Sequence, residues 1–80
     1  MIIEIKVLSS LRNYVQPSEN HLDGDRWDIG ERATVGQVLE MLNLRGRGDL
    51  ILLVNGNRAQ NESVLSEGDA LSILPPIGGG

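Results

Sequence analysis

The chain has 80 residues, enough for one domain and too few for a second. Its net charge of −4 disfavours nucleic acid or an anionic membrane as a partner, and we expect neither. It contains no cysteine, which excludes disulfides, thiolate metal sites and a cysteine nucleophile.

The location of the protein follows from its apolar segments. No apolar run approaches the roughly 20 residues that a membrane-spanning helix needs. Met1 leads straight into an alternating strand pattern, without the basic and apolar regions of a signal peptide. We therefore expect a cytoplasmic protein.

The N-terminal third predicts two paired strands. Residues 2–8 alternate, with Ile3, Ile5 and Val7 on one side and Glu4 and Lys6 on the other, which is typical of a half-buried strand. The next segment, residues 9–15, forms a turn or a short helical piece. Residues 16–25 read as a loop that leads into a turn. Residues 27–29 then form a second strand, which we expect to pair with the first as a hairpin.

Residues 34–44 predict the main helix. Thr34 and Gln37 have the spacing of a capping box, in which each side chain bonds the other residue's free backbone N–H. Apolar residues recur at i, i+3, i+4 and i+7 and form one stripe for packing on a sheet: Val35, Val38, Leu39 and Leu42. We expect Gly46 and Gly48 to end the helix.

The C-terminal half predicts three more strands. Residues 50–54 form a continuous apolar run, typical of a well-buried strand. Asn55-Gly56 is a strong turn signal, and a short strand over residues 58–60 follows. Residues 67–69 form another turn. The last strand covers residues 71–73 and ends before two prolines, which cannot continue a sheet.

The order of these elements predicts an α+β fold of the β-grasp, or ubiquitin-like, type. One helix stripe packed on one mixed sheet makes a complete two-layer domain. We expect about four to five strands packed on one main helix. The domain would cover residues 1–76, and residues 77–80 would form a flexible glycine tail.

The tail is the candidate for reactive chemistry. An α-carboxylate on Gly80 is ionised at neutral pH because its pKa is about 3.5, and no side chain obstructs it. Glycines have no Cβ, which lets Gly78 and Gly79 enter a narrow enzyme channel. Pro75 and Pro76 have a fixed φ and would project the tail away from the sheet. Ile77 joins the prolines to the glycines and belongs to the same threading segment.

Strand alternation also predicts a partner surface beside this tail. If Leu52, Val54, Leu71 and Ile73 face the core, other aliphatic residues of the same strands must face outward together. Those residues are Ile51, Leu53 and Leu74. An aliphatic patch of this kind marks a partner site.

The chain resembles a family of ubiquitin-like sulfur carriers, the MoaD/ThiS family. The resemblance rests on Thr34-Val35-Gly36-x-Val38-Leu39-x-x-Leu42, on Leu52-x-Val54-Asn55-Gly56, and on Glu67-Gly68-Asp69-x-Leu71-x-Ile73-x-Pro75-Pro76-Ile77-x-Gly79-Gly80. It covers nearly the whole chain and is weakest over residues 9–30. The terminal Pro-Pro-x-x-Gly-Gly after the last strand is its most specific part.

The resemblance implies a carrier that is not itself an enzyme. An activating enzyme uses ATP to adenylate the Gly80 carboxylate, a sulfur donor converts it to a thiocarboxylate, and an acceptor enzyme withdraws the sulfur. No cofactor or metal is expected on the carrier itself. Pro75 and Pro76 favour the molybdopterin branch, in which the acceptor is the large subunit of molybdopterin synthase.

Other functions remain open. Ser9-Ser10 and Ser72-x-Leu74 stand in the regions where molybdopterin carriers often have aromatic residues, so a thiamine-type or other sulfur carrier is an alternative. A protein modifier conjugated through Gly80 is a second class. Lys6 is the only lysine, so lysine-linked chains of this protein could form only there. A β-grasp interaction module with an inert tail is a third class.

The remaining polar residues point to no catalytic site. His21 stands alone in a polar segment without another histidine, and no Ser-His-Asp grouping or phosphate-binding loop is visible. Arg45 and Arg47 are interpreted as solvated charges at the helix end. Trp27 is expected to pack in the core or at an edge.

Overall fold

The computed structural model describes residues 1–47 and 49–76. Within these residues the chain forms six strands and two helices, in the order β1 (Ile2–Val7), α1 (Ser9–Arg12), β2 (His21–Asp23), β3 (Arg26–Asp28), α2 (Val35–Met41), β4 (Ile51–Val54), β5 (Asn57–Arg58) and β6 (Ala70–Leu74). The predicted tail, residues 77–80, lies outside the described residues.

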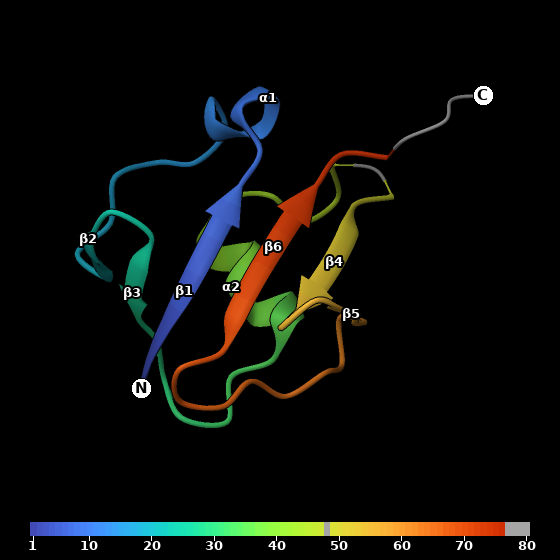
Figure 1. Cartoon of the computed structure of the whole chain (residues 1–80). Coiled ribbons are helices and arrows are strands. Elements are labelled where there is room, and N and C mark those ends of the chain that lie inside the picture. The colour runs from blue at the N-terminus through green and yellow to red at the C-terminus, as the bar shows by residue number, and fades with distance from the viewer. Residues whose placement is uncertain (48, 77–80) are drawn as a thin grey trace.

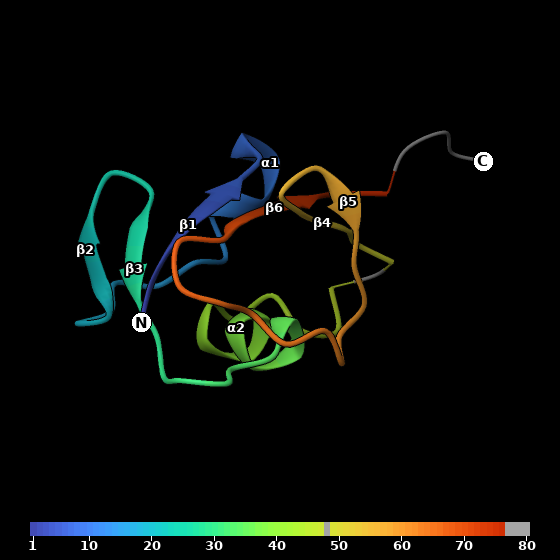
Figure 2. The ribbon, with the colours of Figure 1, turned by 60° about the horizontal axis from the view of Figure 1, so that its bottom comes forward.

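The strands form one mixed sheet in the order β2-β3-β1-β6-β4-β5. The central pair, β1 and β6, is parallel, and every other pair is antiparallel. Helix α2 covers one face of this sheet, which gives the two layers seen in Figure 1 and, from a second direction, in Figure 2. The α+β β-grasp prediction is confirmed.

The core lies between the sheet and α2, where the two apolar patterns of the sequence meet. The helix stripe is buried throughout, from Val35 and Leu42, which are inaccessible to solvent, to Leu39 at 4% exposed. Ile3 and Ile5 face it from β1, and Leu71 and Ile73 face it from β6. This aliphatic interior explains how a chain with only two large aromatic residues closes its core.

Helix α2 begins as predicted and ends earlier than predicted. Gln37 N–H donates to Thr34 Oγ1 at 3.2 Å and Thr34 N–H donates to Gln37 Oε1 at 2.9 Å, which completes the capping box. The helix ends at Met41 because Asn43 adopts a left-handed conformation, with φ of 62°. Leu44 N–H then donates to Leu39 O at 2.8 Å, the long bond of a Schellman cap.

The predicted helix end at Gly46 and Gly48 is therefore wrong. Asparagine tolerates the left-handed region better than most residues, so Asn43 can reverse the chain without a glycine. The reversal returns Leu44 to the core, where it is inaccessible to solvent. Gly46 follows this cap, and Gly48 lies outside the described residues.

The predicted loop over residues 16–25 contains a strand. His21–Asp23 pairs antiparallel with Arg26–Asp28, so β2 forms the sheet edge beyond β3 (Figure 1). All three β2 residues are exposed, and a strand without a buried face has no alternating pattern to reveal it. The predicted strand over residues 27–29 is confirmed as the partner of β1, shifted by one residue.

The described residues contain neither a membrane-spanning helix nor a cluster of metal-binding side chains. Neither helix in residues 1–47 and 49–76 is long and apolar enough to cross a membrane. Within the same ranges, no group of three His, Cys, Asp or Glu side chains could hold a metal ion.

Candidate functional site

The base of the tail is the point where β6 ends at Leu74 and the chain continues into Pro75 and Pro76. It is positioned by the parallel pairing of β1 and β6. Lys6 pairs with Ser72 and Val7 with Ile73, so both strands run in one direction and end at the same edge of the sheet. Beyond the strands, Leu8 N–H still donates to Ile73 O at 3.2 Å. Figure 1 shows the consequence: α1 and the end of β6 lie at the same end of the molecule.

The last described residues lead away from this edge. β6 is held between β1 and β4, and its inward side chains, Leu71 and Ile73, are inaccessible to solvent. Pro75 is half-buried and Pro76 is exposed. Proline has no N–H to continue the ladder, so the sheet ends here. The other predicted tail residues, Ile77, Gly78, Gly79 and Gly80, lie outside the described residues.

The predicted phase of the strands is confirmed. Leu52 is 7% exposed and, like Leu71 and Ile73, faces the core, while Val54 is half-buried and packs against it. Ile51 pairs with Leu74 across β4 and β6, on the opposite face of the sheet. The three candidate partner residues are half-buried instead of fully exposed: Ile51, Leu53 and Leu74.

A fourth aliphatic residue belongs to this surface. Leu8 follows β1, has an extended backbone with φ of −61° and ψ of 146°, and is 47% exposed. By alternation we place it on the outward side with Lys6, and its N–H donates to Ile73 O, the residue before Leu74. We call Leu8, Ile51, Leu53 and Leu74 the docking patch.

Sequence reasoning missed Leu8 although a signal was present. Residues 2, 4 and 6 of the first strand face outward, so position 8 continues their parity. The alternation does not show which residues are the neighbours of Leu8, because only the pairing of β1 with β6 brings Leu8 to the end of β6. Leu8 is also the N-cap residue of α1, and no side-chain hydrogen bond caps that helix.

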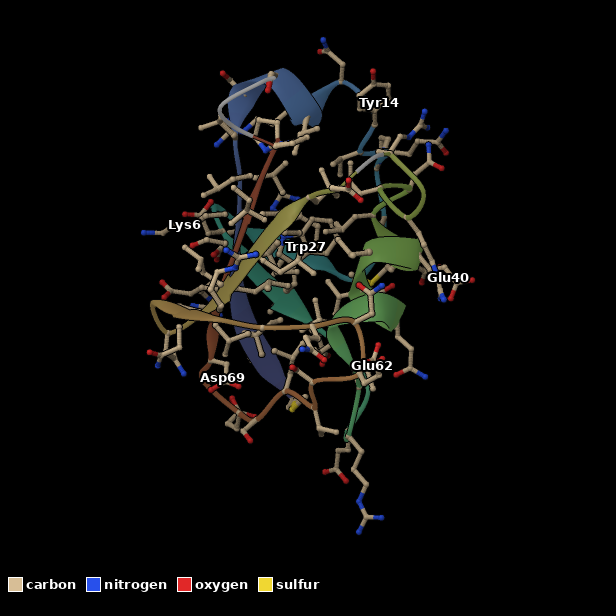
Figure 3. All side chains as sticks on the ribbon, turned by 90° about the vertical axis from the view of Figure 1, so that its right-hand side faces the viewer. Lys6, Tyr14, Trp27, Glu40, Glu62 and Asp69 are labelled. Atoms are coloured by element: carbon tan, nitrogen blue, oxygen red, sulfur yellow. The ribbon has the colours of Figure 1, made fainter. Side chains whose placement is uncertain are left out.

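Basic residues flank the docking patch on both sides. One row of cross-strand neighbours runs from Lys6 through Ser72 and Leu53 to Arg58. Lys6 and Arg58 are exposed. Figure 3 shows Lys6 projecting from the side of the sheet opposite to α2. The outward face of the sheet is thus apolar near the base of the tail. The row of residues that contains Leu53 has a basic side chain at each end, Lys6 and Arg58.

The other candidate residues have structural roles. Trp27 is buried, as expected, and His21 stacks on it with ring centroids 4.6 Å apart. His21 Nε2 also lies 2.8 Å from Gly24 O, inside the β2-β3 hairpin. A cavity of about 430 Å³ lies beside this pair on the core side of β1, between the hairpin and the segment after α1.

Arg45 and Arg47 lie at the end of α2, as expected. Arg45 Nη1 is 3.3 Å from Glu40 Oε2, and both side chains are largely exposed. The Arg47 guanidinium lies 4.1 Å from the centre of the Tyr14 ring, and its Nε donates to Asn43 O at 3.2 Å. The contact of Arg47 with Tyr14 ties the segment after α2 to the segment after α1.

Comparison with known proteins decides the family. The model of the ThiS family matches residues 5–80. The chain belongs to the ThiS family. The match includes the docking patch, the two prolines and the terminal glycines, so the tail is part of the family pattern.

Solved structures agree with this ThiS family assignment. The crystal structure of SAMP1 from Haloferax volcanii is 25% identical, with a TM-score of 0.66, and each chain is covered over 100% of its length. A crystal structure of H. volcanii small archaeal modifier protein 1 is 26% identical, with a TM-score of 0.69, over 95% of this chain and 98% of that chain. A search of the curated proteins found no match.

Proposed function

We propose that this ThiS family protein is a carrier whose Gly80 carboxylate is activated by a partner enzyme and converted to a thiocarboxylate. The observation that carries the proposal is the position of the tail base. β6 ends at Leu74, inside the docking patch, so an enzyme bound to the patch would have the tail beside it. The family match through Gly80 supports the same reading.

The chemistry needs little from the carrier itself. The ionised Gly80 carboxylate attacks the α-phosphate of ATP, pyrophosphate leaves, and an acyl adenylate forms. Hydrosulfide then attacks the carbonyl carbon, the bond from that carbon to the AMP oxygen breaks, and a thiocarboxylate and AMP are formed with loss of a proton. The activating enzyme supplies ATP binding and catalysis. The carrier supplies a slim end of glycines without side chains, so we propose that it is a substrate and subunit of enzymes and not an enzyme.

The docking patch has an energetic role in this scheme. Ordering a tail inside an enzyme costs about 1–2 kcal/mol per residue in backbone entropy. Burial of apolar surface gives about 25 cal/mol per Å², so an aliphatic patch next to the tail base can offset that cost. Partner binding by Ile51, Leu53 and Leu74 is therefore part of the proposal, and Leu8 extends the same surface.

The acceptor that we favour is the large subunit of molybdopterin synthase. Pro75 and Pro76 support this branch, because they are the part of the tail that resembles molybdopterin carriers. A thiamine-type or another sulfur acceptor is the alternative.

A second candidate function is protein modification. It is favoured by the similarity to two solved structures of small archaeal modifier proteins. In that case the activated Gly80 carboxyl would be joined to a lysine of a target protein. Both functions begin with adenylation of Gly80 and differ in the nucleophile that follows.

The test is an alkylation experiment with the full chain. The protein is incubated with the activating enzyme of its host, ATP and a sulfur donor, then treated with a thiol alkylator, and its intact mass is recorded. The chain has no cysteine, so any alkylated sulfur must come from the reaction. Oxidation of Met1 or Met41 changes the mass by nearly the same amount as an oxygen-to-sulfur exchange, but oxidised methionine does not take up the alkylator.

The expected result is one alkyl adduct that maps to Gly80 and is absent when Gly80 is deleted. ATP-dependent adenylation without an alkylated species, together with isopeptide adducts in cells, would favour the modifier. No reaction, with an enzyme proven active on its own carrier, would contradict both functions and favour a binding module.

A further inference from the structure

Lys6 is the only lysine of the chain, and its amine is accessible. It lies on the outward side of β1 and projects away from the body of the domain (Figure 3). The ion pairs within residues 1–47 and 49–76 join Met1 to Asp28, Arg26 to Asp23 and Arg45 to Glu40, so Lys6 takes part in none of them. Its Nζ is held by no acid in that part of the chain.

The other amine of the described chain is engaged. The amino group of Met1 donates to Ile29 O at 2.7 Å and lies 3.5 Å from Asp28 Oδ1. Acylation there would break the bond to Ile29 and the ion pair, whereas acylation of Lys6 breaks no side-chain hydrogen bond or ion pair of the described residues. Lys6 is thus the easier of the two positions for an acyl group.

Lys6 also borders the docking patch. It pairs with Ser72, and Ser72 pairs with Leu53, so Lys6 and Leu53 are two strands apart in one row. Neighbouring strands are about 4.8 Å apart, which puts their backbones roughly 10 Å apart. Leu8 and Leu74 lie in the next row toward the tail. A bulky group on the flexible Lys6 stem therefore lies over the face that carries the patch.

We propose that Lys6 is an acylation site and that its modification closes the docking patch. The acyl donor is the adenylated Gly80 carboxyl of a second copy, so the inference rests on the proposed function. The deprotonated Lys6 Nζ attacks the Gly80 carbonyl, an amide bond forms, the bond from that carbonyl to the AMP oxygen breaks, and AMP leaves while the nitrogen loses a proton.

This geometry makes homotypic conjugates grow in one direction only. The acceptor copy keeps a free Gly80, but its docking patch is covered by the donor copy, so the activating enzyme no longer engages it. Conjugates can then grow only on the uncovered Lys6 of the donor copy. A sulfur donor that consumes the adenylate would suppress the reaction, which links conjugation to sulfur shortage.

The first arm of the test measures conjugation. Wild type and Lys6→Arg are incubated with the activating enzyme and ATP, without a sulfur donor, and analysed by intact mass and peptide mapping. Wild type should form a species of two chains less one water, branched at Lys6, and Lys6→Arg should not. A branch at Met1, or no conjugate while adenylation proceeds, would overturn the assignment of Lys6 as acceptor.

The second arm measures closure of the patch by ATP–pyrophosphate exchange. Wild type is acylated at Lys6 with an acetyl or a biotinyl N-hydroxysuccinimide ester, and Lys6→Arg is treated identically to control for reaction at Met1. The biotinyl form should lose at least tenfold in kcat/KM and the acetyl form clearly less, while treated Lys6→Arg stays within about twofold of its untreated form.

The outcomes separate this inference from the proposed function. Equal exchange by acylated and unmodified wild type, or an equal loss in the treated Lys6→Arg control, would overturn closure by Lys6. Failure of untreated wild type to support exchange would instead overturn the proposed function, and the inference would fall with it. Circular dichroism of each acylated form checks that the fold is retained.

Discussion

The side chain of Asn55 connects the β4-β5 turn to the start of β6 through Asp69. Asn55 Nδ2 donates to Asp69 Oδ1 at 3.0 Å, across 14 positions of the chain. Asn55 Oδ1 accepts from Ala70 N–H at 3.0 Å, and Asn55 N–H donates to Ala70 O at 2.8 Å. The turn is thereby joined to the first residue of the strand that leads to the tail.

Replacement of Asn55 by glycine tests this connection. Asn55 has a φ of 52°, which glycine adopts without strain, so Asn55→Gly removes the two side-chain hydrogen bonds and little else. We expect the free energy of unfolding, measured with urea, to fall by about 1–2 kcal/mol. Asn13→Ala, at an exposed asparagine, should change it by less than about 0.5 kcal/mol. Equal stabilities for both variants would show that the connection contributes nothing.

Adjacent leucines of β4 separate binding from folding. Leu53→Asp places a carboxylate on the outward face and should keep the melting temperature within a few degrees while kcat/KM for adenylation falls. Leu52→Asp buries an unpaired carboxylate in the core, where Leu52 is 7% exposed, and should unfold the domain. Thermal melts followed by circular dichroism, together with ATP–pyrophosphate exchange, measure both. A folded Leu53→Asp with normal exchange would remove Leu53 from the docking patch.

Two exposed leucines at different places test the extension of the patch. Leu8 is 47% exposed beside the tail base, and Leu22 is 43% exposed on the edge strand β2. Leu8→Ser should raise the KM of the activating enzyme for the carrier by roughly fivefold, which corresponds to a loss of about 1 kcal/mol in binding free energy. Leu22→Ser should leave KM unchanged. Equal effects of the two substitutions would mean that general surface hydrophobicity, and not the docking patch, governs binding.

Gly36 tests the contact between α2 and the segment before Leu65. A Cβ added at Gly36 would lie 3.2 Å from Asn61 O, and Gly36 N–H already donates to that oxygen at 2.9 Å. Alanine is favoured over glycine in a helix by about 1 kcal/mol, but crowding of a backbone atom costs about 1–3 kcal/mol. We therefore expect Gly36→Ala to lower the unfolding free energy.

The control for Gly36 is Gly30→Ala. A Cβ at Gly30 meets nothing within 4 Å, so this substitution should be near neutral in the same urea titration. Stabilisation by Gly36→Ala would show that the Asn61 segment moves freely and does not hold the start of α2.

Much of the site followed from local patterns. Leu71 and Ile73 alternate with Ser72 in the sequence, whereas residues 50–54 are a continuous apolar run, so the inward Leu52 and the outward Leu53 were a hypothesis that the structure confirms. The capping box of Thr34 and the Asn55-Gly56 turn were also readable, since each depends on residues a few positions apart. The role of Gly80 in the proposed function comes from the tail and the family pattern and stays a prediction.

The tertiary structure decided what local patterns do not contain. The parallel pairing of β1 with β6 joins residues more than 60 positions apart, and it alone brings Leu8 and Lys6 next to the strand that carries the tail. The sequence did not predict the strand β2, because an exposed edge strand has no alternation of apolar and polar residues. It did not predict the helix end at Asn43 either, because nothing in the sequence distinguishes a left-handed asparagine from other asparagines. Periodicity sets which way a side chain faces, whereas long-range backbone pairing sets which side chains become its neighbours.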